Sequence, residues 1–147
     1  MIVLRLLAAL AAMQTVLIGF ALAQPTYVPG IVMWVIDGDT YRIRYDGAPQ
    51  GETVRARHFD TAEKGDRAAC QTEAEFAQQG SEMARRLLPK GTGVLLSDFG
   101  RDRYGRLLAT VTLTDGRDLA TVMIDTGLAH PYEGGRKQGW CPAGEAS

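Results

Sequence analysis

The chain has 147 residues, of which 46 % are hydrophobic and 22 % are charged, ordinary values for one soluble globular domain. Its 16 basic and 17 acidic side chains give a net charge of −1 at pH 7. That balance argues against a strong non-specific nucleic-acid binder, which usually shows a basic footprint. It leaves room for an enzyme that gathers a few arginines at its site.

Residues 1–23 have the pattern of a secretory signal peptide. Arg5 is their only charged residue, an almost wholly apolar run follows it, and Ala21-Leu22-Ala23 fits the rule for cleavage before Gln24. We therefore predict a periplasmic or secreted protein whose mature domain is residues 24–147, with no stable membrane association after cleavage. The alternative is an uncleaved membrane anchor, because the apolar run approaches the roughly 20 residues that a span needs.

Strand patterns follow the leader. Residues 31–36 are apolar on both faces, which is typical of a buried barrel strand, and residues 40–45 alternate between polar and apolar side chains. The composition of residues 46–51 indicates a turn, and residues 52–58 form a third expected strand.

A helix is expected after a charged connection over residues 59–69. Thr72 and Glu75 have the spacing of a capping box, apolar residues recur at helical spacing as far as Leu87, and Pro89 ends the pattern. Two more strands are then expected, over residues 93–98 and 105–113.

A second, short helix is expected to begin after Asp118 and to end at Gly127, whereas residues 130–147 show no periodicity. Five short strands and two helices predict a mainly β, α+β domain with a five-stranded barrel of the oligonucleotide-binding type. Propensity alone does not separate that barrel from other small α+β folds.

Cys70 and Cys141 are the two cysteines of the chain. Export to an oxidising compartment favours a disulfide between them, and the alternative is two free thiols. Neither cysteine has the spacing of a zinc ligand.

Three polar motifs supply carboxylates for a hard cation and arginines for a phosphate: Ile36-Asp37-Gly38-Asp39-Thr40, residues 54–63 and residues 102–106. Taken singly, each has a plainer interpretation as a tight turn, a helix cap or a solvated stripe, and we assign Arg42, Arg44 and Arg57 to such a stripe. Strict alternation places Arg55 and Asp60 on opposite faces, so the strand must bend or end between them if both serve one site.

In this order the motifs resemble those of the staphylococcal-nuclease-like (thermonuclease) family, from about Ile31 to Tyr132. The resemblance implies an oligonucleotide-binding-type barrel and calcium-dependent hydrolysis of the phosphodiester bonds of DNA and RNA. The matching calcium ligands are Asp39, Asp60 and the carbonyl of Thr61, with Asp37 and Thr40 in support.

The same resemblance assigns the catalytic and substrate-binding positions. Glu63 matches the residue that activates or orients the attacking water, and Arg55 and Arg106 match the two arginines that grip the scissile phosphate. The positions implied to contact the rest of the substrate are Arg103, Tyr104 and Tyr132.

The sequence departs from the family in three respects. Ala62 stands where proline is usual, which loosens the loop that holds Glu63. The chain stops soon after Cys141, so it lacks room for the last long helix, in whose place a Cys70–Cys141 bond would tie down the tail. Its acidic balance differs from the basic character of the best-known member.

We predict from these features a monomeric, exported, calcium-dependent nuclease. The alternatives are a non-catalytic barrel that binds nucleic acid or a protein, and a structural secreted domain. The five matched residues favour the enzyme, because a binding module would need none of the carboxylates.

Overall fold

The barrel interior is built from strand residues whose apolar side chains alternate with polar ones. In the computed structural model, which describes residues 26–145, the buried interior side chains include Val32, Tyr41, Ile43, Val54 and Val111. The predicted signal peptide lies outside the described residues. The strands that form the barrel are β1 (Val28–Val35), β2 (Thr40–Tyr45), β3 (Ala48–Ala56), β5 (Gly93–Arg101) and β6 (Leu107–Thr112).

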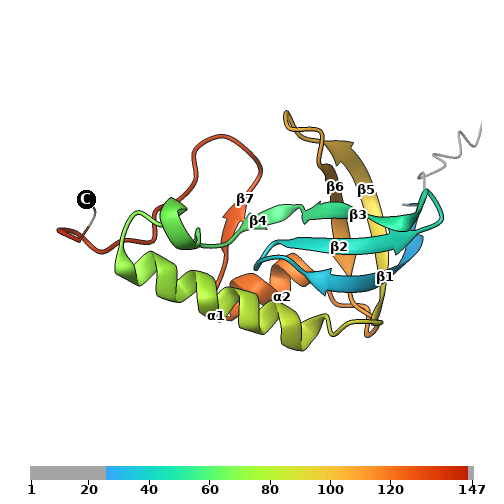
Figure 1. The fold of residues 1–147 in the computed structure, drawn as a ribbon, viewed down its shortest axis with the longest axis horizontal. Coiled ribbons are helices and arrows are strands. Elements are labelled where there is room, and N and C mark those ends of the chain that lie inside the picture. The colour runs from blue at the N-terminus through green and yellow to red at the C-terminus, as the bar shows by residue number, and fades with distance from the viewer. Residues whose placement is uncertain (1–25, 146–147) are drawn as a thin grey trace, which may run out of the picture.

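These five strands close in the order β1-β2-β3-β6-β5 (Figure 1). The β3–β6 pair is parallel and the other pairs are antiparallel. The five-stranded barrel predicted from the sequence is thus confirmed. The hairpin between β2 and β3 is tighter than expected, because β3 already begins at Ala48 rather than at Glu52.

Two helices cover one side of the barrel, α1 (Gln71–Leu87) and α2 (Leu119–Asp125) (Figure 1). Asp118 caps α2 as expected, since its side chain accepts a hydrogen bond from the Thr121 amide at 2.9 Å. Among the described residues, no helix is long and apolar enough to cross a membrane.

The expected cap of α1 is wrong. Cys70, not Thr72, is the N-cap residue, and its sulfur accepts from the Glu73 amide at 3.4 Å. Glu73 in turn accepts from the amide of Ala69, the residue before the cap, at 2.7 Å, so the helix begins two residues earlier than predicted with a variant of the capping box. The hydroxyl of Thr72 instead donates to Glu145 at 2.6 Å.

A second, two-stranded sheet lies beside the barrel. It pairs β4 (His58–Asp60) with β7 (His130–Tyr132), and the single turn η2 (Gly65–Arg67) follows β4. Strand β7 was not predicted, because three residues are too few for an alternating pattern to show. This small sheet brings the C-terminal part of the chain next to the residues that precede α1.

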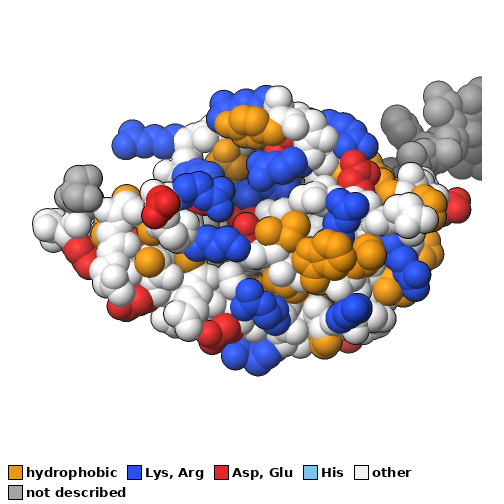
Figure 2. All heavy atoms as spheres, viewed as in Figure 1, with side chains coloured by type: hydrophobic (Ala, Val, Ile, Leu, Met, Phe, Trp, Pro, Cys, Tyr) orange, Lys and Arg blue, Asp and Glu red, His pale blue; other side chains and the backbone are white. Residues whose placement is uncertain are grey.

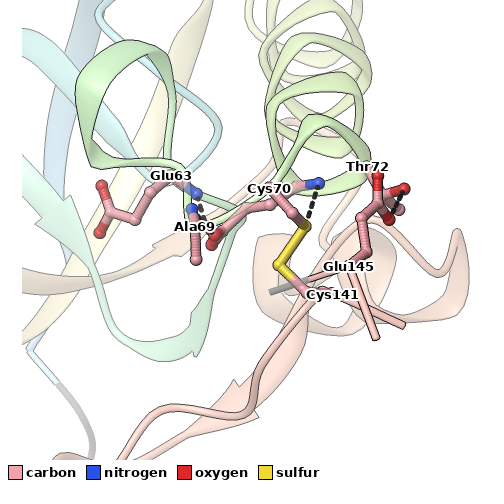
Figure 3. Close-up of a disulfide and its surroundings, with 7 residues drawn as sticks. Glu63, Ala69, Cys70, Thr72, Cys141 and Glu145 are labelled. Atoms are coloured by element: carbon pink, nitrogen blue, oxygen red, sulfur yellow. Dashed lines mark hydrogen bonds between the residues drawn. A yellow bond between two sulfur atoms is a disulfide. The ribbon is translucent and has the colours of Figure 1, made fainter. Parts of the chain in front are cut away.

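The C-terminal segment is tied to the start of α1 by the Cys70–Cys141 disulfide, whose Cα atoms are 6.0 Å apart (Figure 3). The predicted pairing therefore occurs in the structure, and neither described cysteine is free. As Figure 3 shows, Glu145 also reaches Thr72 on the first turn of α1.

Candidate active site

The turn between β1 and β2 presents the Asp37-Gly38-Asp39 motif. A Cβ at Gly38 would lie 2.7 Å from Cγ2 of Thr61, so glycine permits the close approach of these two segments. The buried Tyr41 hydroxyl donates to the Gly38 carbonyl at 2.5 Å and fixes the turn from inside the barrel.

A bend after β3 brings two motifs together. The backbone leaves the barrel at Ala56 and enters β4 at His58, whose φ of 72° is in the left-handed region. This bend removes the alternation that would separate Arg55 from Asp60. Both ring nitrogens of His58 are engaged, Nδ1 with Glu133 at 2.7 Å and Nε2 with the Thr110 hydroxyl at 2.9 Å, which holds the bend in place.

Arg55 joins the two aspartates of the predicted metal site. Its Nη1 donates to Asp39 Oδ1 at 2.7 Å and its Nη2 to Asp60 Oδ1 at 2.5 Å. Both carboxylates are buried, and the Arg55 side chain is 13 % exposed. Although burial by itself opposes it, the negative charges of Asp39 and Asp60 raise the pKa of Arg55.

Asp39 is held by further hydrogen bonds from its neighbours. Its Oδ1 accepts from the Thr40 hydroxyl at 2.9 Å, and its Oδ2 accepts from the amide and the hydroxyl of Thr61 at 3.0 and 3.1 Å. Asp37 accepts from the Asp39 amide at 3.4 Å, and burial followed by the charge of Asp39 raises the pKa of Asp37. Five predicted residues thus converge with Arg55 on one point: Asp37, Asp39, Thr40, Asp60 and Thr61.

Glu63 reaches this cluster through a residue that the sequence analysis did not identify. Lys137 places its Nζ 2.8 Å from Glu63 Oε1 and 2.9 Å from Asp60 Oδ1. The other Glu63 oxygen lies 3.3 Å from Nε of Arg67. Although burial opposes it, the hydrogen bonds to Asp60 and Glu63 raise the pKa of Lys137.

The turn between β5 and β6 carries the third motif, and Asp102 organises it. Its Oδ1 accepts from the amides of Tyr104 and Arg106 at 2.8 and 3.0 Å, while its Oδ2 accepts from Arg106 Nε at 2.7 Å. Against the effect of burial, the hydrogen bonds from Arg106 lower the pKa of Asp102. Asp102 was part of the motif but was assigned no role from the sequence.

Arg103 and Tyr104 form a pair at the tip of the same turn. Arg103 donates to the Tyr104 hydroxyl at 2.7 Å, and its guanidinium carbon lies 4.8 Å from the centre of the Tyr104 ring. Tyr104 is 69 % exposed. An aromatic ring flanked by guanidinium groups and open to solvent is suited to stacking on a nucleotide base.

A cavity of about 740 Å³ connects these motifs. Its lining includes Arg55, Glu63, Tyr132 and Lys137, together with Arg103, Tyr104 and Arg106 of the β5–β6 turn. Figure 2 shows Lys and Arg side chains gathered on the face that carries β4 and β7, with acidic side chains visible between them. No contact joins Arg106 to Arg55; the two arginines face a shared space.

The oxygen-rich donor set fits a hard divalent cation. Asp39 and Asp60 each accept a hydrogen bond from the Arg55 guanidinium, so two carboxylates of the kind that such a cation binds lie close together. Arg55 and Lys137 both form ion pairs with Asp60. Within residues 26–145, no group of three or more His, Cys, Asp or Glu side chains is disposed to hold a metal ion.

The fold is an oligonucleotide-binding-type barrel, and its cavity is lined by arginines and carboxylates. The chain belongs to the staphylococcal nuclease homologue family, whose model matches residues 53–140. It is also 29 % identical over 106 residues to proteins named uncharacterized endonuclease from Escherichia coli O157:H7 and Escherichia coli. The match covers 72 % of this chain and 62 % of each relative, so it spans less than two thirds of their length.

Proposed function

We propose that this protein is an exported, calcium-dependent nuclease that hydrolyses phosphodiester bonds in DNA and RNA. The observation that carries the proposal is the placement of Arg55 between Asp39 and Asp60 at a cavity that Arg106 also lines. Membership of the staphylococcal nuclease homologue family and the names of the two relatives support the reaction class. The leader pattern of residues 1–23 supports export.

The two aspartates and the Thr61 carbonyl would hold the calcium ion, with Asp37 and Thr40 fixing the shape of the site. When bound, the ion would polarise a phosphoryl oxygen and lower the cost of bringing a nucleophile to the anionic phosphate. The hydrogen bonds that Thr40 and Thr61 donate to Asp39 orient that carboxylate before any ligand arrives.

Arg55 and Arg106 would bind the scissile phosphate from two sides of the cavity. A guanidinium fork matches two phosphate oxygens and binds more strongly as those oxygens gain charge in the transition state. Asp102 fixes the Arg106 side chain through Nε, which orients the fork in advance. Arg103, Tyr104 and Tyr132 would contact the neighbouring phosphate and base.

Glu63 would take or orient the proton of the attacking water. Its carboxylate is partly exposed at the cavity wall, and it shares Lys137 with the calcium ligand Asp60, so the base lies next to the metal site. A positioned general base contributes about 10²–10⁴-fold to the rate of such a step.

The direct test uses purified mature protein with labelled single-stranded DNA and RNA oligonucleotides, in calcium or in chelator. We expect cleavage of both substrates in calcium and none in chelator, and loss of cleavage in Glu63→Gln. Tight binding of either oligonucleotide with no cleavage in any divalent cation would instead favour the non-catalytic barrel.

A further inference from the structure

The segment after β7 is fixed across the cavity at several points. Trp140 stacks on His130 with ring centres 3.8 Å apart and packs against Phe76 at 5.0 Å. Cys141 is then bonded to Cys70 at the start of α1. At the other end, the Tyr132 hydroxyl donates to the carbonyl of Gly135 at 3.2 Å. We call residues 133–141 the tail segment.

Lys137 lies between these fixed points in the chain, and it lines the cavity. Its ammonium bridges Asp60 and Glu63, at 2.9 and 2.8 Å. Arg136, the preceding residue, is an exposed cation, and the cavity lining includes Lys137 but not Arg136. Of these two neighbouring cations of the tail segment, only Lys137 therefore places its charge in the site.

Glu63 needs such support because little else fixes its side chain. Its amide donates to Glu73 Oε1 at 3.3 Å, which holds the backbone but leaves the side chain to other contacts. The contact of Glu63 with Arg67 is longer, at 3.3 Å, and the Arg67 side chain is 64 % exposed. The Lys137 side chain is less exposed, at 40 %, so its ion pair with Glu63 is less weakened by solvent. The shorter contact with Lys137 also links the glutamate to Asp60.

We propose that Lys137 is a positioning residue that holds Glu63 next to Asp60, and that the Cys70–Cys141 disulfide keeps it there. This inference rests on the proposed nuclease function, in which Glu63 acts on water and Asp60 binds the cation. Lys137 acts through Glu63 and does not itself contact the reacting atoms.

The charge of Lys137 should affect cation binding and turnover in opposite directions. The Lys137 ammonium shares Asp60 with the cation, so its charge opposes cation binding while it positions the base. Removing that charge should slow turnover and at the same time tighten calcium binding. Replacing a residue that merely supported the fold would instead lower both the turnover rate and the calcium affinity.

The test compares Lys137→Met with Arg136→Met, which removes an equal charge one residue away. We expect Lys137→Met to lower kcat about tenfold with little change in KM, less than the roughly 10²–10⁴-fold that a general base contributes, because Glu63 itself is still present. Calorimetric titration with calcium, without substrate, should show several-fold tighter binding. Lys137→Arg should restore much of kcat, and Arg136→Met should match wild type in rate and calcium affinity.

A double-mutant cycle tests the role of the disulfide. Cys70→Ser/Cys141→Ser should lower kcat by a factor similar to that of Lys137→Met. The triple variant should be little slower than Lys137→Met alone, because the disulfide acts through the same side chain. Fully additive losses would overturn this part of the proposal.

Three results with Lys137→Met would overturn the positioning role: a rate equal to that of Arg136→Met, a faster rate, or a parallel fall in rate, calcium affinity and melting temperature. If wild-type protein cleaves no oligonucleotide, the proposed function fails, and with it the role of Glu63. The calcium titration still decides whether the Lys137 ammonium acts on the carboxylate pair, since equal affinity in both Met variants would exclude that contact too.

Discussion

Arg55 Nη2 donates to Asp60 Oδ1 at 2.5 Å, although five residues of regular strand would direct these side chains to opposite faces. The left-handed backbone of His58, at φ 72°, separates β3 from β4 and turns Asp60 back toward the barrel. The bend lets one arginine contact both predicted calcium aspartates. A site of this kind depends on a local break in the strand as much as on the residues that it joins.

Arg106→Lys is the cleaner test of the two phosphate arginines, because Arg106 is more exposed than Arg55. Lysine keeps the charge but loses the planar fork. Losing a preorganised donor to developing charge typically costs about 10²–10³ in kcat, or roughly 3–4 kcal/mol. We expect a fall of that order in single-turnover cleavage of a defined oligonucleotide at saturating calcium, with a melting temperature near that of wild type.

Arg44→Lys is the control for this experiment, because Arg44 is exposed on β2 and does not line the cavity. Arg55→Lys should slow cleavage by a similar factor but also lower the melting temperature, since Arg55 pairs with two buried carboxylates. A near-wild-type rate for Arg106→Lys would exclude it from transition-state binding.

Asp102→Asn tests whether the β5–β6 turn orients Arg106. The amide oxygen can still accept from the backbone amides, but the amide nitrogen cannot accept from Arg106 Nε. We expect kcat to fall several-fold, less than for Arg106→Lys, with the fold retained. Asp115→Asn is a matched control, because Asp115 makes the same contacts to Arg117 away from the cavity. Equal rates for the two variants would contradict the orienting role.

Most of the fold could be predicted because its strands are long enough for period-two alternation to show. The alternation of residues 40–45 predicted strand β2 correctly, and Asp118 correctly predicted the start of α2. The start of α1 was predicted two residues too late because either of two Glu residues could occupy the third position of the helix. The contact of Glu73 with the Ala69 amide decides between them. β7 was missed because its three residues are defined only by pairing with β4.

The candidate site was predictable as far as its residues lie in compact motifs. Asp39, Arg55 and Asp60 converge in the structure, yet the sequence could state only that the strand must bend between the last two. Lys137 was not identified because it is 74 residues from Glu63, and their contact depends on a tail held by a disulfide. No local pattern marks such a residue.

If the protein is exported, its mature form should have a defined N-terminus. Cleavage after Ala23 would produce a mature chain that begins at Gln24, because Ala21-Leu22-Ala23 satisfies the small-residue rule. Intact-mass spectrometry of the periplasmic and secreted fractions measures this directly. Recovery of chains that begin at Met1 in the membrane fraction would favour the anchor.

Loss of the disulfide should destabilise the protein without abolishing helix α1. The chain-entropy model assigns roughly 4 kcal/mol to closing a loop of this length, as an upper value. Serine at position 70 is itself a good N-cap, so Cys70→Ser/Cys141→Ser retains a cap on α1. Urea unfolding of this variant beside wild type, with and without reductant, measures the difference. Two alkylatable thiols in natively exported protein would contradict the bond.

Asp39→Asn tests calcium binding at the centre of the site. The substitution keeps the size of the side chain but removes the charge and one acceptor oxygen, so it loses either the two bonds from Arg55 and Thr40 or the two from Thr61. We expect no calorimetric calcium binding and no cleavage, together with a loss of about 1–3 kcal/mol in unfolding free energy for the buried group left unpaired. Wild-type calcium affinity should be weak, about 10⁻⁴–10⁻³ M, as in other extracellular modules.

The control for Asp39→Asn is Asp66→Asn, which removes an exposed carboxylate from η2 near the same loop. Its calcium affinity, cleavage rate and stability should equal those of wild type. Because Asp39→Asn is expected to be less stable, the titration is done well below its melting temperature, with the fold verified by circular dichroism. Undiminished calcium binding by a folded Asp39→Asn protein, or full cleavage in chelator, would refute the role of this carboxylate.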